Sequence, residues 1–252
     1  MPQSNQTEFQ FAVVADPHIG EVDDPGFRAF ISFLDAIQAT PPDFILVAGD
    51  LGLGWIDAFE QLLSQTRGRI PPLHVVAGND ESVDGRSRLR ELFADDFGDR
   101  DFYSFAHKNA LFIAMCNAIP KDHTGHFSSQ SIRGHDQSLW IAEQMEGDRD
   151  HVFLFGHVPP HPTGEEFDPD LGGGLFIARN DQDFLRQLVL KHEPDAMFFG
   201  HTHCKRQFPI GSTPVFILPC LNPLFGGPTS EYLHVSVQQD GISTEYITLS
   251  PG

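Results

Sequence analysis

The stretch FAVVADPHIG, residues 11–20, decides the fold prediction. It begins with a short apolar run that contains β-branched residues, which is the pattern of a buried strand. The run ends in Asp16 and His18, whose side chains point to the same side of an extended backbone because they lie two positions apart. Pro17 between them has no N–H for a sheet, which suits a strand end. A carboxylate and an imidazole that converge in this way can bind a transition-metal ion.

Four further apolar runs end in side chains of the same kind. They end at Gly49-Asp50, Gly78-Asn79-Asp80, Gly156-His157 and Gly200-His201-Thr202-His203. A single D-x-H pair is a weak signal, since most such pairs are ordinary surface residues. Chance could produce one such strand end but hardly five in the same position. A glycine at the end of a strand lets the backbone turn and approach a ligand closely. We therefore expect a metal site where the five strands end.

The segments between these runs have the apolar spacing of amphipathic helices. The expected helices begin near Asp24-Pro25, Ile56, Leu89, Asp136 and Asp181. Aspartate is a favoured helix cap, and proline is favoured in the first turn. Alternating strands and helices are typical of an α/β fold, in which ligands bind beyond the carboxyl ends of the strands.

The chain after His203 changes character. Strands are expected at 213–218, 232–237 and 245–249, separated by turn-forming residues. With no linker or repeat before them, these strands are expected to complete a second sheet, and the 23 phenylalanines suit an apolar layer between two facing sheets. We predict a single domain over residues 1–252, an α/β sandwich of two sheets flanked by helices. The glycine-rich segment 161–174 is expected to be a loop, either an ordinary surface loop or one that covers the substrate.

Charge and composition exclude several classes of function. The net charge of −19 argues against an extended nucleic-acid interface, which needs a basic face. No apolar run is long enough to span a membrane, and the first ten residues lack the pattern of a signal peptide. Cys116, Cys204 and Cys220 are too few for a disulfide framework, so we expect a reducing, cytoplasmic location. Cys204 follows His203 directly, but we expect a small role for it at most.

Taken in order, the five strand-end motifs resemble the signature of the calcineurin-like metallophosphoesterases. The resemblance covers residues 16 to 203 and implies a two-sheet sandwich with two metal ions between the strand ends. It implies one metal ion held by Asp16, His18, Asp50 and His203, and a second held by Asp50, Asn79, His157 and His201. Asp50 would bridge the two ions. Within the family, the compact chain is most similar to the branch that contains the class III cyclic nucleotide phosphodiesterases.

The resemblance implies a dinuclear metal-dependent phosphohydrolase. Four imidazoles with oxygen ligands favour Mn, Fe or Zn over Mg or Ca, so two divalent or trivalent transition-metal ions are expected as cofactors. Such ions would activate a water and would offset the acidic surface for a small phosphate-ester substrate, with a phosphodiester favoured. Two alternatives stay open: a phosphomonoesterase or nucleotide pyrophosphatase, and a catalytically weak scaffold that binds a partner protein. A homodimer is one option for the oligomeric state.

Two further residues are candidates for catalysis. Asp80 stands where the family usually has a histidine that donates to the phosphate or leaving group. An ionised aspartate, alone or paired with an arginine such as Arg86 or Arg88, would make the enzyme slow and selective for good leaving groups. A protonated Asp80 would instead be the general acid, and we favour the ionised form because two metal ions would stabilise it. His161, just beyond His157, is the first choice for a phosphate donor, ahead of His123 and His126.

Overall fold

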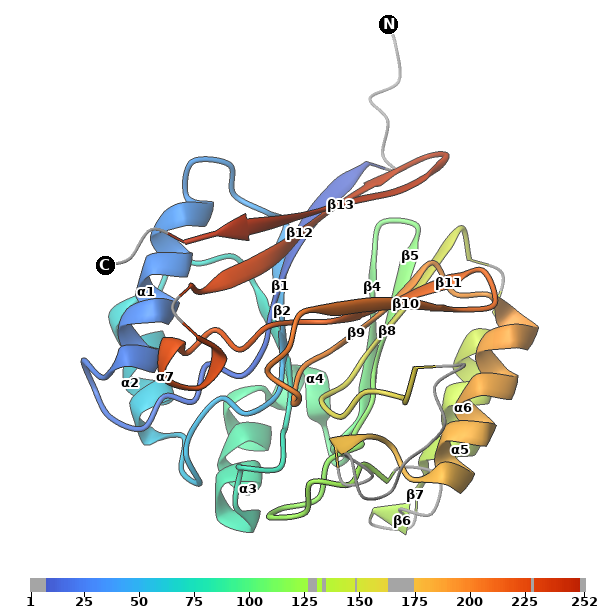
Figure 1. The fold of residues 1–252 in the computed structure, drawn as a ribbon, viewed down its shortest axis with the longest axis horizontal. Coiled ribbons are helices and arrows are strands. Elements are labelled where there is room, and N and C mark those ends of the chain that lie inside the picture. The colour runs from blue at the N-terminus through green and yellow to red at the C-terminus, as the bar shows by residue number, and fades with distance from the viewer. Residues whose placement is uncertain are drawn as a thin grey trace, which may run out of the picture.

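The structure is a computed structural model that describes residues 8–126, 131–132, 135–147, 149–162, 175–227 and 229–249. Two sheets form its centre (Figure 1). The first has the order β13-β12-β1-β2-β3, with bounds Gly241–Thr248, Glu231–Gln238, Phe9–Val14, Phe44–Ala48 and Leu73–Val76. The second has the order β10-β11-β9-β8-β5-β4, with bounds Arg206–Ile210, Thr213–Ile217, Ala196–Phe199, His151–Phe155, Ala110–Ala114 and Tyr103–His107. A short hairpin pairs β6 (Ser131–Ile132) with β7 (His135–Asp136).

A layer of phenylalanine rings holds the two sheets together. Phe11 of β1 has no exposed surface, and its ring lies 5.2 Å from Phe112 of β5, 5.5 Å from Phe153 of β8 and 5.7 Å from Phe198 of β9. Edge-to-face contacts of this kind add about 0.5–1.5 kcal/mol each to the burial of the rings. The expected apolar layer between facing sheets is therefore present.

Helices cover the outer faces of the sandwich. On the side of the first sheet lie α1 (Pro25–Ile37) and α2 (Asp57–Gln65), and on the side of the second lie α5 (Gln137–Met145) and α6 (Arg179–His192) (Figure 1). Shorter connecting helices are α3 (Val83–Leu92), α4 (Ala94–Phe97) and α7 (Pro223–Gly226). The two-sheet α/β fold flanked by helices is thus confirmed. Within the described residues, no helix is both long and apolar enough to cross a membrane.

Two of the expected helix caps are confirmed and one is wrong. Asp24 accepts a hydrogen bond from the backbone N–H of Phe27, and Asp136 accepts from those of Ser138 and Leu139. Asp181 is no cap, because α6 begins earlier, at Arg179, and Asp181 lies in its first turn.

The strands after His203 do not all join the second sheet, so that expectation is wrong in part. β11 pairs with β9 in the second sheet, but β12 pairs antiparallel with β1 and carries β13 with it, which extends the first sheet. Strand periodicity shows which residues form a strand but not which edge that strand pairs with. The hairpin of β4 and β5 and the edge strand β10 were not expected from the sequence.

Parallel pairing brings the motif-bearing strand ends to one edge. β1, β2 and β3 run parallel in the first sheet, as do β5, β8, β9 and β11 in the second. Beyond the strands, the N–H of Asp16 donates to the carbonyl of Gly49, at 3.2 Å, and that of His18 to the carbonyl of Asp50, at 2.9 Å. The polar side chains therefore leave neighbouring strands at the same level.

Candidate metal centre

The backbone at this edge is strained at the residues that carry the polar side chains. Five of them have positive φ, which is uncommon outside glycine and is concentrated at functional sites. They are Asp16 at 54°, His18 at 42°, Asp50 at 48°, His201 at 70° and His203 at 57°. Left-handed backbone therefore follows β1, β2 and β9, at residues whose side chains meet at this edge.

Two glycines that precede polar residues, Gly78 and Gly200, leave room for neighbouring side chains. A Cβ on Gly78 would lie 2.0 Å from Asp50 Oδ1, and one on Gly200 would lie 2.4 Å from Asp16 Oδ2. Both distances are far below any tolerable contact. The glycines were expected to let the backbone approach a ligand. In the structure they let one strand end approach the carboxylate side chain of another.

A first group of donor atoms converges between β1, β2 and the end of β9. His18 Nε2 lies 3.0 Å from His203 Nε2, 4.0 Å from Asp16 Oδ1 and 3.9 Å from Asp50 Oδ2. His203 Nε2 lies 3.7 Å from Asp16 Oδ1. Two nitrogens and two carboxylate oxygens within this space match the donor set of a transition-metal ion.

A second group shares Asp50 and contains two histidines whose tautomers are fixed. His157 Nδ1 lies 2.9 Å from the carbonyl of Ala48, and His201 Nε2 lies 2.9 Å from the carbonyl of His123. A carbonyl can only accept, so each of these nitrogens carries its proton, and in the neutral rings His157 Nε2 and His201 Nδ1 keep lone pairs. These two atoms face each other at 3.2 Å.

Oxygen atoms complete the second group. Asn79 Oδ1 lies 3.1 Å from His157 Nε2, and Asp50 Oδ2 lies 3.3 Å from the same nitrogen. Four atoms that can all act as acceptors thus point at one another, an arrangement that needs either a proton or a cation among them. The donors present therefore fit a metal ion of the imidazole-binding kind.

Buried charge shifts the protonation of these groups strongly. Burial raises the pKa of Asp16 to about 7, whereas the pKa of Asp50 falls below its usual range because His157 and His18 outweigh its burial. Burial opposes a charge on His157, but Asp50 and Asp16 raise its pKa to about 9. Without a metal, a proton on His157 joins the acceptors around it.

Two of the site histidines, His201 and His203, are held neutral, whereas the burial of His18 is outweighed by Asp80, Asp16 and Asp50, which raise the pKa of His18. Burial and the neighbouring His157 lower the pKa of His201 to about 3, and burial and His18 lower that of His203 to about 4. A neutral imidazole is the form that binds a metal. These two residues are therefore ready to act as ligands at neutral pH.

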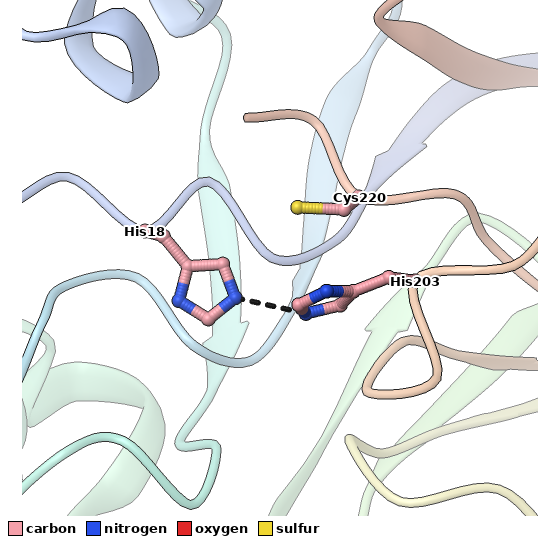
Figure 2. Close-up of side chains that lie close together, drawn as sticks. All are labelled: His18, His203 and Cys220. Atoms are coloured by element: carbon pink, nitrogen blue, oxygen red, sulfur yellow. Dashed lines mark hydrogen bonds between the residues drawn. The ribbon is translucent and has the colours of Figure 1, made fainter. Parts of the chain in front are cut away.

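The cysteine at this site is Cys220, not Cys204. Figure 2 shows Cys220 beside His18 and His203, while Cys204 is exposed. Cys220 Sγ donates to the carbonyl of Asp16, at 3.0 Å, and burial raises the pKa of its thiol. A protonated thiol that donates to backbone fixes the strand end and is a poor metal ligand.

The two catalytic candidates lie in different surroundings. Asp80 Oδ2 lies 3.2 Å from His18 Nδ1, whereas Arg86 contacts the carbonyls of Gly78 and Glu81 and Arg88 pairs with Glu60. The expected pairing of Asp80 with Arg86 or Arg88 is therefore wrong, because both arginines have other partners.

His161 is described with Pro162, but the rest of the expected loop lies outside the described residues. Its N–H donates to Gln182, its Nδ1 lies 2.8 Å from the carbonyl of Pro162, and its ring packs on Phe176 at 4.7 Å. None of these partners belongs to the two donor groups. His123, by contrast, lies with its ring 5.8 Å from that of His201.

Sequence reasoning missed two buried residues that brace the site. Asn117 accepts from the N–H groups of His157 and Val158 and donates to the carbonyl of Val158. Glu81 accepts from the N–H groups of Gly52 and Gly78, which ties the loops after β2 and β3 together. No motif in the sequence marks Asn117. Glu81 could have been found, because it directly follows the Gly78-Asn79-Asp80 motif.

Comparison with known proteins agrees with this geometry. The family profile of calcineurin-like phosphoesterases matches residues 9–205. This chain belongs to that family. No curated protein matches it.

Several solved structures of other proteins share the fold at low sequence identity. A dimetal phosphatase from Danio rerio is 15% identical with a TM-score of 0.65, and the match covers 96% of this chain and 99% of that one. GAP50, described as the anchor in the inner membrane complex of Plasmodium, is 14% identical with a TM-score of 0.63, covering 96% and 85%. The phosphopantetheinyl hydrolase PptH of Mycobacterium tuberculosis is 13% identical with a TM-score of 0.55, covering 89% and 95%. These likenesses establish the architecture of the calcineurin-like fold over nearly the whole chain.

Proposed function

We propose that this calcineurin-like phosphoesterase is a dinuclear metal-dependent phosphohydrolase. The observation that supports this most is the place of Asp50 Oδ2, which lies 3.9 Å from His18 Nε2 in one donor group and 3.3 Å from His157 Nε2 in the other. A carboxylate oxygen shared in this way is what two adjacent metal ions need as a bridge. The proposed ligands are Asp16, His18, Asp50 and His203 for one ion, and Asp50, Asn79, His157 and His201 for the other.

Two transition-metal ions, with Mn, Fe or Zn favoured by the imidazole-rich set, would supply Lewis-acid activation of water and of the phosphoryl oxygens when bound. The chain's own residues prepare this site. Asp50 stays ionised, and the carbonyls of Ala48 and His123 hold the protons of His157 Nδ1 and His201 Nε2. All the proposed ligands except His203 are buried at the strand ends, and the side chain of His203 is 28% exposed. Metal binding would displace the proton that otherwise joins His157 to its neighbours.

The substrate we propose is a small phosphate ester, with a phosphodiester favoured. The basis is the similarity to the class III cyclic nucleotide phosphodiesterase branch, together with a net charge of −19, which disfavours long polyanions. Cys116, Cys204 and Cys220 are all free thiols, in keeping with the cytoplasmic location that we propose. A homodimer stays an open option.

Two other functions have some support. The Danio rerio structure is described as a phosphatase, which favours a phosphomonoesterase as the enzymatic alternative, beside a nucleotide pyrophosphatase. GAP50 is described as an anchor, and Asp80 in place of the usual histidine would suit a scaffold with weak catalysis. The convergence of a complete set of metal-binding side chains argues against the scaffold function, because a protein that only binds a partner does not need these side chains.

Metal analysis joined to an ester assay tests the proposal. The purified protein would be stripped, loaded separately with Mn, Fe or Zn, and assayed on chromogenic phosphate mono- and diesters. We expect about two equivalents of bound metal and faster cleavage of the diester. Metal binding without hydrolysis of any ester would favour the scaffold, and faster cleavage of the monoester would favour the phosphatase.

A further inference from the structure

Asp80 contacts one proposed ligand of each metal ion. Its Oδ2 lies 3.2 Å from His18 Nδ1, and its Oδ1 accepts a hydrogen bond of 2.9 Å from Asn79 Nδ2. The backbone N–H of Asp80 donates to Asp50 Oδ1, also at 2.9 Å. The side chain of Asp80 is 33% exposed, whereas that of His18 is 4% exposed. Asp80 therefore lies at the rim of the site with both carboxylate oxygens directed at ligand side chains.

The contact with His18 determines which ring nitrogen can bind a metal. His18 Nε2 faces the first donor group, and Nδ1 is on the opposite side of the ring, toward Asp80. A carboxylate beside Nδ1 favours the tautomer with the proton on that nitrogen, which leaves the lone pair on Nε2. Within the described residues, His18 Nδ1 is buried and makes no hydrogen bond of acceptable geometry, and the carboxylate that it faces, at 3.2 Å, is that of Asp80.

The contact with Asn79 determines which amide atom can bind a metal. The amide of Asn79 carries one donor group and one acceptor atom, and only the oxygen can be a ligand. Because Nδ2 donates to Asp80, Oδ1 is turned toward His157 Nε2, at 3.1 Å. The same carboxylate thus orients a ligand in the second group as well.

We propose that Asp80 is a positioning residue that aligns His18 and Asn79, one ligand of each ion, instead of the acid of the reaction. The proposal rests on the proposed metal centre and adds a role that the usual histidine could not fill. A neutral imidazole offers one acceptor nitrogen, whereas a carboxylate offers two oxygens, and both oxygens of Asp80 face a donor. Aspartate at this position therefore gives up the proton donor of the usual histidine and instead holds one ligand of each proposed metal ion, His18 and Asn79.

The test measures metal affinity separately from activity. Calorimetric titration of metal-stripped protein with Mn²⁺ at neutral pH would compare the wild type with Asp80→Ala, Asp80→Asn and Asp84→Ala. We expect Asp80→Ala to weaken both binding steps, by about 10–100-fold, because partners of metal ligands have effects of this size. Asp80→Asn keeps one acceptor oxygen and should lose less. Asp84 is exposed in the first turn of α3, so Asp84→Ala removes the same charge nearby and should leave both affinities almost unchanged.

A spectroscopic measurement distinguishes positioning from a general loss of structure. In the Zn²⁺-loaded wild type, the Nδ1–H of His18 should give a downfield proton resonance that is absent in Asp80→Ala, while the thermal unfolding of the metal-free variant stays close to that of wild type. Unchanged metal affinity in Asp80→Ala, with kcat reduced and the acidic limb of the pH profile lost, would overturn the proposal and make Asp80 the acid. Failure of the wild type to bind metal would instead reject the proposed function, so the two failures are distinguishable.

Discussion

At the scale of single residues, the site depends on which side-chain atom faces inward. Asp50 reaches both donor groups with one oxygen, whereas Asn79 reaches only the second. The inward atoms are fixed from outside the group, by Ala48 for His157 and by His123 for His201. Replacing a ligand should therefore have an effect that depends on how many ions it touches.

Asp50→Ala should cost both metal ions, and Asn79→Ala mainly the second. The reason is that Asp50 is the proposed bridge, whereas Asn79 belongs to one ion. Metal content after gel filtration would show little tightly bound metal in the first variant and about one equivalent in the second. His234→Ala is a suitable control, because His234 on β12 contacts Gln10 and lies outside both groups. Nearly two equivalents in Asp50→Ala would reject the ligand assignment.

His161→Ala should lower kcat/KM if His161 donates to the phosphate. A hydrogen bond to a charged group is worth enough for a loss of about tenfold. Steady-state kinetics of the metal-loaded variant would measure it, with His123→Ala compared in parallel because His123 packs against His201. Full activity in His161→Ala would return His161 to the role of an ordinary loop residue.

At the scale of elements, buried side chains connect the strand ends that carry the ligands. Asn117 lies beyond the end of β5 and makes three hydrogen bonds with the backbone at the end of β8, where His157 begins the turn. It is fully buried, so water cannot replace these bonds. This one side chain fixes the distance between two neighbouring strand ends of the second sheet.

Asn117→Ala should destabilise the protein by about 3 kcal/mol or more, because it leaves buried N–H and carbonyl groups without partners. Urea unfolding of the metal-free protein would measure the change in free energy. Asn117→Asp keeps the oxygen that accepts from His157 and Val158, and should recover part of the loss if its carboxylate is tolerated. A loss below about 0.5 kcal/mol in Asn117→Ala would show that the turn holds its shape without this side chain.

At the scale of the whole molecule, the buried charges couple metal binding to stability. In the metal-free protein, Asp16 and Glu81 have pKa values of about 7, both raised chiefly by burial, and His157 has a pKa of about 9. The folded state therefore binds more protons than the unfolded state at neutral and weakly alkaline pH.

That residues 1–252 form one domain stays a prediction. A single cooperative unfolding transition would support it.

The metal-free protein should become less stable as the pH rises from 6.5 to about 9. A raised folded pKa contributes stability that is lost as the pH passes through it, first for Asp16 and Glu81 and then for His157. His201 and His203, with lowered pKa values, act in the opposite direction at and below about pH 6.5, where they gain protons only in the unfolded state. The raised pKa of His18 acts in the same direction as that of His157. Thermal unfolding across this range would measure the slope.

The Mn²⁺-loaded protein is the control, because the metal takes the place of the protons on Asp16 and His157 and binds more tightly as they leave. Its unfolding temperature should not fall over the same pH range. A metal-free protein whose stability rises with pH would contradict the assigned protonation of Asp16, Glu81 and His157.

Local patterns in the sequence determined much of this molecule. Short apolar runs followed by Asp16-Pro17-His18 or by glycine and a polar residue identified the strand ends, the calcineurin-like family and the edge at which the site would lie. Asp24 and Asp136 marked helix starts correctly. These features depend on residues a few positions apart, since strand alternation, helix capping and strand-end turns are local.

Tertiary structure alone decided the contacts that join distant segments. β12 pairs with β1 instead of entering the second sheet, and Asp80 faces His18 instead of an arginine. The thiol of Cys220, not that of the adjacent Cys204, lies with the imidazoles of His18 and His203. Many strands have the same alternation, and many side chains the same donors, so sequence pattern does not choose among partners. Sheet edges, the burial of the phenylalanine layer and the space between strand ends make that choice, because they exist only once the chain has folded.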